Sequence, residues 1–281
     1  MMRGGVRRSP RRLGIWLLAL GTAALGGGQP SRPIDVRDGF EAPALSALWT
    51  TERALPGAIE LQSAVVRSGH GAVAVTLRPG DQLPDEAGTE LERAELMEAR
   101  DLVSREGGSY AFSFSLFLPA GFPIVPTRLV LAQWKQYCPS GRCGQDNPVL
   151  ALRYQDGEFR VTLHAGSKTT TLYRTREEIR GRWQDFSFQV RFSRTGDGRV
   201  LASRNGAPLI DYRGATCYSE ADGFPPGGLF YFKVGLYRDR TPATMRVYID
   251  DYEKKELSAP GLDGRGAPAA RDDAISSGRI P

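Results

Sequence analysis

Histidine and cysteine are scarce in this chain, which has two histidines and three cysteines among its 281 residues. The histidines, His70 and His164, are far apart in the sequence, and Cys138, Cys143 and Cys217 do not have the spacing of a zinc site. This scarcity argues against a structural zinc site. We therefore expect a protein without a metal centre of this kind and without a cofactor.

The sequence also lacks a hydrophobic run long enough to cross a bilayer comfortably. Its main apolar stretch, Leu13–Leu25, follows five arginines and precedes small residues, which is the pattern of a secretory signal peptide. We predict that residues 1–28 form this signal, with an uncleaved membrane anchor as the alternative. The mature protein is then periplasmic or secreted, and no membrane partner is expected after cleavage.

Neither sign of charge dominates the predicted mature chain. The first 28 residues contain five of the 37 lysines and arginines and none of the 32 acidic residues, so the remainder is close to neutral. Overall charge therefore gives no reason to expect a nucleic-acid partner. Only a local cluster of cations could attract a polyanion.

The few cysteines are informative in the oxidising compartment that an exported protein enters. Cys138 and Cys143 are close enough in the sequence to form a disulfide within one loop. Cys217 would then have no partner in the chain.

The segment Gly228–Arg240 has the clearest alternation of apolar and polar residues, which is the period of a β-strand with one buried face. The apolar face consists of Phe230, Phe232, Val234 and Leu236. The other face consists of Tyr231, Lys233, Gly235 and Tyr237. Glycine on that face leaves room for something to lie close to the backbone. An ordinary exposed sheet face is the alternative interpretation.

Similar alternation recurs along the chain and predicts an all-β protein. Roughly a dozen short strands follow one another at intervals of about 8–12 residues, with almost no helix. We predict a two-sheet β-jelly roll, a concanavalin-like sandwich with a concave polar cleft, over residues 39–257. Residues 29–38 are predicted as a linker, and residues 258–281, which are rich in Gly, Ala and Pro, as a disordered tail.

Two segments favour a helix locally. Thr175 and Glu178 have the spacing of a capping box, which predicts a short helix ending near Gly181. Leu91–Glu98 is rich in residues with high helix propensity.

Polar residues at alternate positions mark three of the predicted strands. If these strands share one sheet, they form a polar floor, and such a floor on a curved sheet suits an extended sugar polymer. The floor would contain Arg93, Glu95, Gln133, Lys135, Tyr231, Lys233 and Tyr237.

Three segments resemble the signature motifs of jelly-roll polysaccharide lyases. They are Arg-Ala-Glu-Leu at 93–96, Gln-Trp-Lys at 133–135 and Tyr-Phe-Lys-Val-Gly-Leu-Tyr at 231–237. In order and position they are similar to motifs of heparin lyase I, the glucuronan lyases and the alginate lyases of polysaccharide lyase family 7. The resemblance spans about residues 35–257 and implies that Leu91–Glu98 is a strand of the concave sheet.

The resemblance implies a lyase that cleaves an anionic, uronic-acid-containing polysaccharide by β-elimination. We expect the protein to be a monomer. Arg93 and Gln133 would neutralise the uronate carboxylate, and Tyr237 would be the catalytic acid. Lys233 would lie near the substrate, with Tyr231 and Glu95 as further substrate-binding residues.

Lys135 departs from the family pattern, which has histidine at this position. A lysine at its ordinary pKa is protonated and cannot accept a proton. Three readings stay open. Lys135 is the base because its surroundings lower that value, or it binds the carboxylate while Tyr237 acts as both base and acid, or the protein is a non-catalytic carbohydrate-binding protein of the same fold.

Less specific interpretations exist for several of these residues. Arg93 and Glu95 could be an ion pair that serves only the fold, or Glu95 could keep Arg93 in place. Trp134 alternates with Gln133 and Lys135 and should lie in the core. For His164, a surface or structural role is favoured.

A glycoside hydrolase is a further alternative to the lyase and to the non-catalytic binding protein. Hydrolysis by a carboxylate pair is disfavoured because Tyr248 occupies the position where the jelly-roll hydrolase pattern has its first acid. Asp250, Asp251 and Glu253 could instead bind a structural calcium ion.

Overall fold

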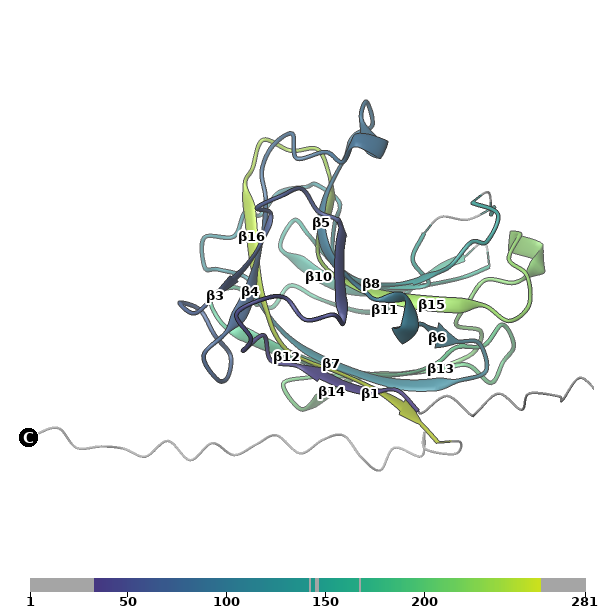
Figure 1. The fold of residues 1–281 in the computed structure, drawn as a ribbon. Helices are drawn as coiled ribbons and strands as arrows, with labels where there is room; N and C mark the ends of the chain where they lie inside the picture. Colours follow the sequence, from purple (N-terminus) through teal and green to yellow (C-terminus); the bar gives the residue numbers. More distant parts are fainter. Residues whose placement is uncertain (1–32, 142, 145–146, 167, 259–281) are drawn as a thin grey trace, which may run out of the picture. The chain divides into compact units, whose positions relative to one another are not determined.

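The computed structural model describes residues 33–258, except residues 142, 145–146 and 167. The predicted signal, residues 1–28, and the predicted tail beyond Ser258 lie outside the described residues. Nearly all regular structure consists of two antiparallel sheets packed face to face, which confirms the predicted two-sheet β-jelly roll. Figure 1 shows the two sheets as curved layers, and the outer face of one of them is concave.

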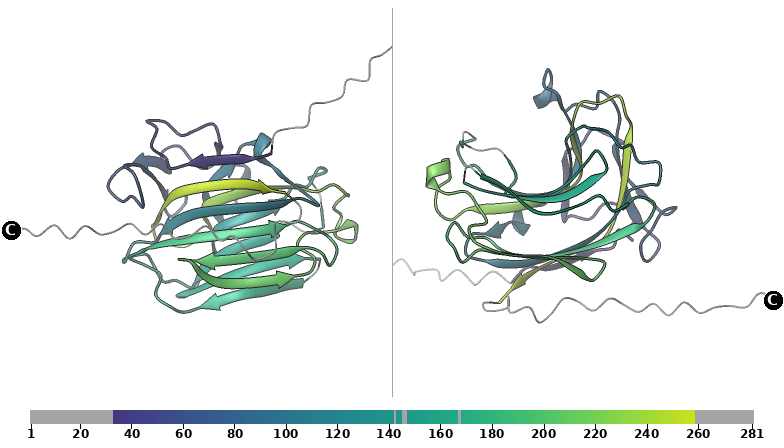
Figure 2. Two further views of the ribbon diagram at one scale, coloured as in Figure 1. Left: turned by 90° about the horizontal axis from the view of Figure 1, so that it is seen from below. Right: turned by 180° about the vertical axis from the view of Figure 1, so that it is seen from behind.

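One sheet, called sheet A, has the order β14-β13-β12-β7-β16-β4-β3, and β1 also pairs with β16. Its strands lie side by side in the left view of Figure 2. They are β1 (Asp35–Asp38), β3 (Ile59–Gln62), β4 (Ala72–Leu77), β7 (Ser109–Phe117), β12 (Trp183–Arg191), β13 (Arg199–Arg204), β14 (Ala207–Arg213) and β16 (Met245–Leu257).

The other sheet, called sheet B, has the order β11-β10-β9-β8-β15-β5-β2, and β6 also pairs with β15. Its outer face is the concave one in Figure 1. Its strands are β2 (Trp49–Arg53), β5 (Leu91–Glu98), β6 (Ser104–Arg105), β8 (Leu129–Gln136), β9 (Leu150–Gln155), β10 (Glu158–Ala165), β11 (Lys168–Thr175) and β15 (Leu229–Asp239).

The boundaries differ from the prediction in two places. Asp35–Asp38, assigned above to the linker, is strand β1, and it pairs with β16 from Asp35↔Lys255 to Asp38↔Tyr252. No helix forms after Thr175. Its hydroxyl accepts a hydrogen bond from the amide of Glu177 at 3.0 Å, but the chain then crosses from sheet B to sheet A and buries Ile179. The helices in the described residues are three 3-10 turns, η1 (Pro84–Glu86), η2 (Arg100–Leu102) and η3 (Glu220–Asp222).

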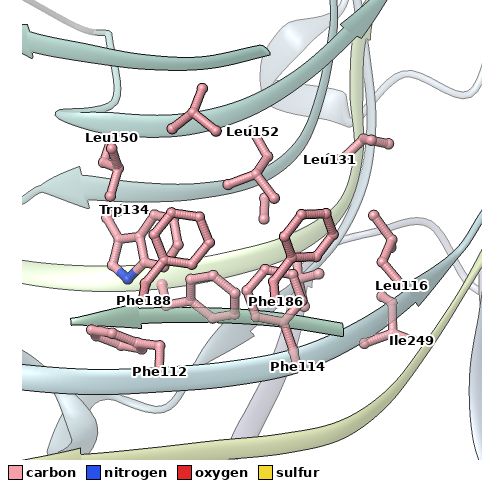
Figure 3. Packing of buried hydrophobic residues seen from close by; sticks show 14 of the residues in the cluster. Phe112, Phe114, Leu116, Leu131, Trp134, Leu150, Leu152, Phe186, Phe188 and Ile249 are labelled. Carbon is pink, nitrogen blue, oxygen red and sulfur yellow. The ribbon is translucent and has the colours of Figure 1, made fainter. Parts of the chain in front are cut away.

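The core between the sheets is rich in aromatic rings, and it decides which side chains reach the concave face. Trp134 on β8 is fully buried, as predicted, and its ring centroid lies 4.8 Å from Phe188 and 5.4 Å from Phe112 of sheet A. Figure 3 shows these three rings between the two sheets. Because side chains alternate along a strand, a buried Trp134 sends Gln133 and Lys135 to the opposite, concave face.

Strand β5 forms despite its helical propensity because the fold neutralises its buried acids. Glu92 and Glu98 are completely buried on the side of β5 that faces the other sheet. Glu92 pairs with Arg238 at 2.8 Å, and Glu98 pairs with Lys254 at 2.9 Å and accepts a hydrogen bond from Tyr252. These partners come from β15 and β16, so no local propensity could reveal them.

Gly235 on β15 is needed for the strand pairing rather than for a ligand. Its φ of 145° is open only to glycine, and a Cβ there would lie 2.4 Å from the carbonyl oxygen of Ala94 on β5. The close approach inferred from the sequence is therefore an approach of the neighbouring strand. A β-bulge between Val234 and Tyr237 accompanies it in the pairing with β8.

Candidate active site

The three polar segments predicted from the sequence lie on adjacent strands in the centre of sheet B. Strand β15 pairs with β5 on one side and with β8 on the other. Tyr237 is opposite Arg93, Lys233 is opposite Gln133, and Tyr231 is opposite Lys135. Directly opposed residues share a face of the sheet, so the sequence patterns did identify one polar floor.

Glu95 is the centre of the buried part of this floor, with a side chain 2% exposed. One of its carboxylate oxygens accepts a hydrogen bond from the amide of Gln133. The other lies 3.7 Å from Nη1 of Arg93 and 3.5 Å from Nζ of Lys233. One carboxylate thus contacts three residues from three strands, and this arrangement limits where each can point.

Tyr237 lies against two guanidinium groups. Cζ of Arg93 is 4.3 Å from the centroid of the Tyr237 ring, and Cζ of Arg128 is 4.9 Å from it. Asp239 positions Arg128 through an ion pair of 2.5 Å. Burial lowers the pKa of Arg128, but hydrogen bonds to Asp239 and to Tyr237 outweigh it and raise that pKa. Negative charge on the phenol oxygen would therefore be stabilised by two fixed cations.

Tyr237, Arg93 and Arg128 line a cavity of about 340 Å³ on the concave face. The cavity is bounded mainly by cationic and amide side chains. Its lining is Leu91, Arg93, Arg128, Gln133, Lys135, Asn147, Pro148, Lys233 and Tyr237. In the described part of the chain, no carboxylate belongs to this lining, so the cavity suits a negatively charged ligand.

Lys233 is almost completely buried at the bottom of the floor, with 3% of its surface exposed. Burial, helped by the neighbouring cations Arg93, Lys135 and Arg53 and opposed by Glu95, lowers its pKa to about 8. The ammonium group is therefore charged at neutral pH but close to losing its proton.

Tyr231 lies beside the cavity rather than in its lining. Its ring is 5.6 Å from Nζ of Lys233, and it borders a second hollow of about 330 Å³ together with Tyr137, whose surface is 51% exposed. Two tyrosines at one end of the floor offer apolar rings to a sugar.

The predicted disulfide between Cys138 and Cys143 is present, with an S–S distance of 2.08 Å. It closes the loop that follows β8, and Asn147 of the cavity lining comes shortly after this loop. Cys217 is free and buried, and burial raises the pKa of its thiol to about 12. A thiol in this state is inert.

His164 on β10 is buried and does not line the cavity, so the favoured structural reading fits better than a surface one. Burial, followed by the charge of Arg153, lowers the pKa of His164 to about 4. The ring is therefore neutral at physiological pH. The cavity has no histidine in its described lining, and the proton-transferring groups available there are Tyr237, Lys135 and Lys233.

Sequence reasoning missed Arg128, Asn147 and Arg153. Arg128 precedes β8 and reaches Tyr237 only because β8 and β15 pair, and Asn147 follows an irregular loop. Arg153 alternates with the buried Leu152 and Tyr154, so the strand period could have placed it on the concave face.

The acids considered for calcium lie on sheet A, away from this cavity. Asp250 is buried and accepts hydrogen bonds from the backbone amides of Arg67 and Asp251, and burial raises its pKa to about 6. Across residues 33–258 as described, no group of three or more His, Cys, Asp or Glu side chains is arranged to bind a metal ion. The same residues include no helix with the length and hydropathy of a membrane span.

Comparison with known proteins places the chain in a family. A family model described as polysaccharide lyase matches residues 40–253, which is most of the chain. The chain therefore belongs to this family, and it is a polysaccharide lyase. A comparison with curated protein sequences found no match.

Solved structures with a similar fold include lyases and a hydrolase. An endo-β-1,4-glucuronan lyase from the fungus Trichoderma reesei is 18% identical, with a TM-score of 0.62 over 74% of this chain and 91% of that one. A family 131 β-glucanase catalytic domain from Podospora anserina is 13% identical, with a TM-score of 0.51 over 75% and 85%. The alginate lyase AlgAT5 of polysaccharide lyase family 7 is 16% identical, with a TM-score of 0.46 over 66% and 79%. The fold alone therefore does not separate lyase from hydrolase chemistry.

Proposed function

We propose that the protein cleaves a uronic-acid-containing polysaccharide by β-elimination and leaves an unsaturated uronate at the new end. The observation that carries this proposal is the cavity, whose lining combines Tyr237 with the cations Arg93, Arg128, Lys135 and Lys233 and contains no described carboxylate. A carboxylate ligand fits such a lining. A neutral sugar carries no negative charge for these cations to neutralise.

The chemistry requires a neutralised carboxylate, a base and an acid. Arg93 and Gln133 interact with the substrate carboxylate, and the negative charge that develops when the C5 proton leaves is stabilised there. As the C5–H bond breaks, its electrons form the C4–C5 double bond, and the bond from C4 to the glycosidic oxygen breaks. The departing oxygen takes up a proton.

Tyr237 is assigned both proton transfers. As a phenolate it accepts the C5 proton, and as a phenol it then donates a proton to the leaving oxygen. Arg93 and Arg128, 4.3 Å and 4.9 Å from its ring, stabilise the phenolate form. Lys135 binds the substrate carboxylate in this mechanism, and Glu95 positions Gln133, Arg93 and Lys233 rather than contacting sugar.

Hydrolysis is the second candidate because a β-glucanase shares the fold. It requires a pair of carboxylates flanking the scissile bond. The described cavity lining contains none, and Asp250, Asp251 and Glu253 belong to β16 of the other sheet. Elimination therefore agrees better with the residues present.

We also propose that the protein works outside the cytoplasm as a monomer without a metal ion. The disulfide between Cys138 and Cys143 fits an oxidising compartment. The protein's partner is an anionic polysaccharide rather than a nucleic acid. N-terminal sequencing of exported protein should find a start near residues 25–30, and a start at Met1 would contradict the export proposal.

The activity can be tested with a panel of polymers. The mature protein is incubated with polyglucuronate, alginate, a heparin-type polysaccharide and a neutral glucan, and the ultraviolet absorbance of unsaturated uronate is followed. A rise with at least one uronate polymer and none with the glucan is expected. No rise with any polymer that the protein binds would favour the non-catalytic alternative.

Lys135→Ala distinguishes the two roles of Lys135. If Lys135 binds the carboxylate, the variant should raise KM more than it lowers kcat. If Lys135 is the base, kcat should be lost. Lys255→Ala, at an exposed position of β16 that pairs with Asp35, is the matched control.

A further inference from the structure

A row of arginines continues across sheet B from Tyr237. Val130 on β8 is opposite both Tyr237 on β15 and Arg153 on β9. Arg153 is opposite Arg160 on β10, and Arg160 is opposite Arg174 on β11. Opposed residues share a face of the sheet, so the three arginines lie on the concave face that also holds Tyr237.

Arg153 is the unusual member of this row because it is a buried cation without an acidic partner. It is 8% exposed, and its Nε donates to Oγ1 of Thr162 at 2.9 Å. In the described part of the chain no carboxylate lies within ion-pair distance of it. Burial, then repulsion from Arg128 and Arg160, lowers its pKa to about 10, which leaves it charged at neutral pH. An uncompensated buried charge is costly to a fold.

Its neighbours do not supply the missing negative charge. Arg160 has Glu158 at 3.8 Å, but Glu158 also lies 3.9 Å from Arg176. Arg174 is exposed on β11 at the edge of sheet B, and none of the described acids is within ion-pair distance of it. The row therefore carries an excess of positive charge next to the cavity.

We propose that Arg153, Arg160 and Arg174 form a second anion site, which binds the acidic group of a sugar unit flanking the one at Tyr237. Strands in a sheet are about 4.8 Å apart, so β9 lies about 10 Å from β15, within reach of a neighbouring part of one bound chain. This inference rests on the proposed function for its ligand. It specifies that the substrate carries a carboxylate or sulfate on at least one flanking unit, on the β9–β11 side.

Binding can be measured without turnover in a Tyr237→Phe background. The probes are oligosaccharides of β-1,4-linked glucuronate, the same oligosaccharides after partial reduction of their carboxyl groups, and a sulfated heparin-type oligosaccharide. Adding Arg153→Gln should weaken binding of the full acid about ten-fold or more, as expected for a lost charge-assisted hydrogen bond. Arg174→Gln should weaken it several-fold, and both variants should reduce the dependence of affinity on salt.

The control is Arg246→Gln on sheet A, a partly exposed arginine that pairs with Glu60 and should leave affinity unchanged. The difference in affinity between the unreduced and the carboxyl-reduced oligosaccharides should also be smaller with Arg153→Gln than in the Tyr237→Phe protein without it. If Arg153→Gln weakens binding of the glucuronate oligosaccharide more than binding of the sulfated one, the bound group is a carboxylate. The reverse order identifies it as a sulfate.

Unchanged affinity in a folded Arg153→Gln variant would overturn the second anion site. If that variant does not fold, unchanged affinity in Arg174→Gln, an exposed position, would overturn it instead. Failure of the proposed function looks different. In that case the Tyr237→Phe protein would bind the oligosaccharides, and Arg153→Gln would weaken this binding, but the wild-type protein would form no unsaturated product.

Discussion

Tyr237 is the residue on which the proposed chemistry depends. The guanidinium groups of Arg93 and Arg128 lie 4.3 Å and 4.9 Å from its ring centroid, so a phenolate there has two fixed counter-charges. Tyr237→Phe keeps the ring and its packing but removes the exchangeable proton. Turnover should fall by about two to four orders of magnitude while polymer binding is retained. Near-normal turnover in this variant would transfer the base role to Lys135.

Lys233 predicts how binding responds to pH. Burial and neighbouring cations lower its pKa to about 8. Below that pH it is protonated and attracts a carboxylate, and above it the charge is lost. The affinity of Tyr237→Phe for a uronate polymer should therefore fall as pH rises through about 8.

Titration of affinity from pH 6 to pH 9.5 measures this effect, with Lys233→Met as the comparison. The variant should bind more weakly at low pH and should lack the decline near pH 8. An identical decline in Lys233→Met would assign it to another group.

At the scale of elements, the regular pairing of β15 with β5 puts Tyr237 opposite Arg93, and this pairing depends on Gly235. A Cβ at this position would lie 2.4 Å from the carbonyl oxygen of Ala94, in a backbone region reserved for glycine. Gly235→Ala should lower the free energy of unfolding by about 1–3 kcal/mol. Chemical denaturation of this variant beside Gly57→Ala, a positive-φ glycine in a loop with open space around it, separates the contact with β5 from backbone strain alone.

The disulfide loop after β8 offers a second test at this scale. Replacing both Cys138 and Cys143 with serine opens a short loop, which should cost about 2 kcal/mol of stability. Because Asn147 of the cavity lining lies just beyond the loop, we expect weaker polymer binding as well. An unchanged affinity would restrict the disulfide to a role in stability.

The sequence predicts the sheet architecture and the central polar floor because both depend on alternation along a strand. Alternation placed Trp134 in the core and Gln133, Lys135, Lys233 and Tyr237 on the other face, and the structure agrees. The resemblance to lyases was needed for Leu91–Glu98, whose propensity is helical.

What the sequence did not reveal depends on contacts between distant strands. Arg128 reaches Tyr237 only through the pairing of β8 with β15, and strand β1 exists only because β16 is beside it. The capping-box pattern after Thr175 failed because the chain must cross between the sheets there, and that path is a property of the whole fold.

The molecule as a whole is close to neutral once the first 28 residues are set aside, so binding of a polyanion depends on one local surface. Affinity for uronate polymers should weaken as salt rises, since exposed charges are screened beyond about 10 Å at 0.1 M ionic strength. Neutral glucans should not bind. Titrations at several salt concentrations check this, and equal affinity for both polymers would contradict the assignment of the cavity.

The central claim is that this cavity cleaves by elimination and not by hydrolysis. Mass spectrometry of the products from the preferred polymer decides between them most directly. Elimination predicts oligosaccharides one water molecule lighter than their saturated counterparts, with ultraviolet absorbance at the new end, and it predicts that Tyr237→Phe forms almost none. Saturated products of full mass from the wild-type protein would contradict the account.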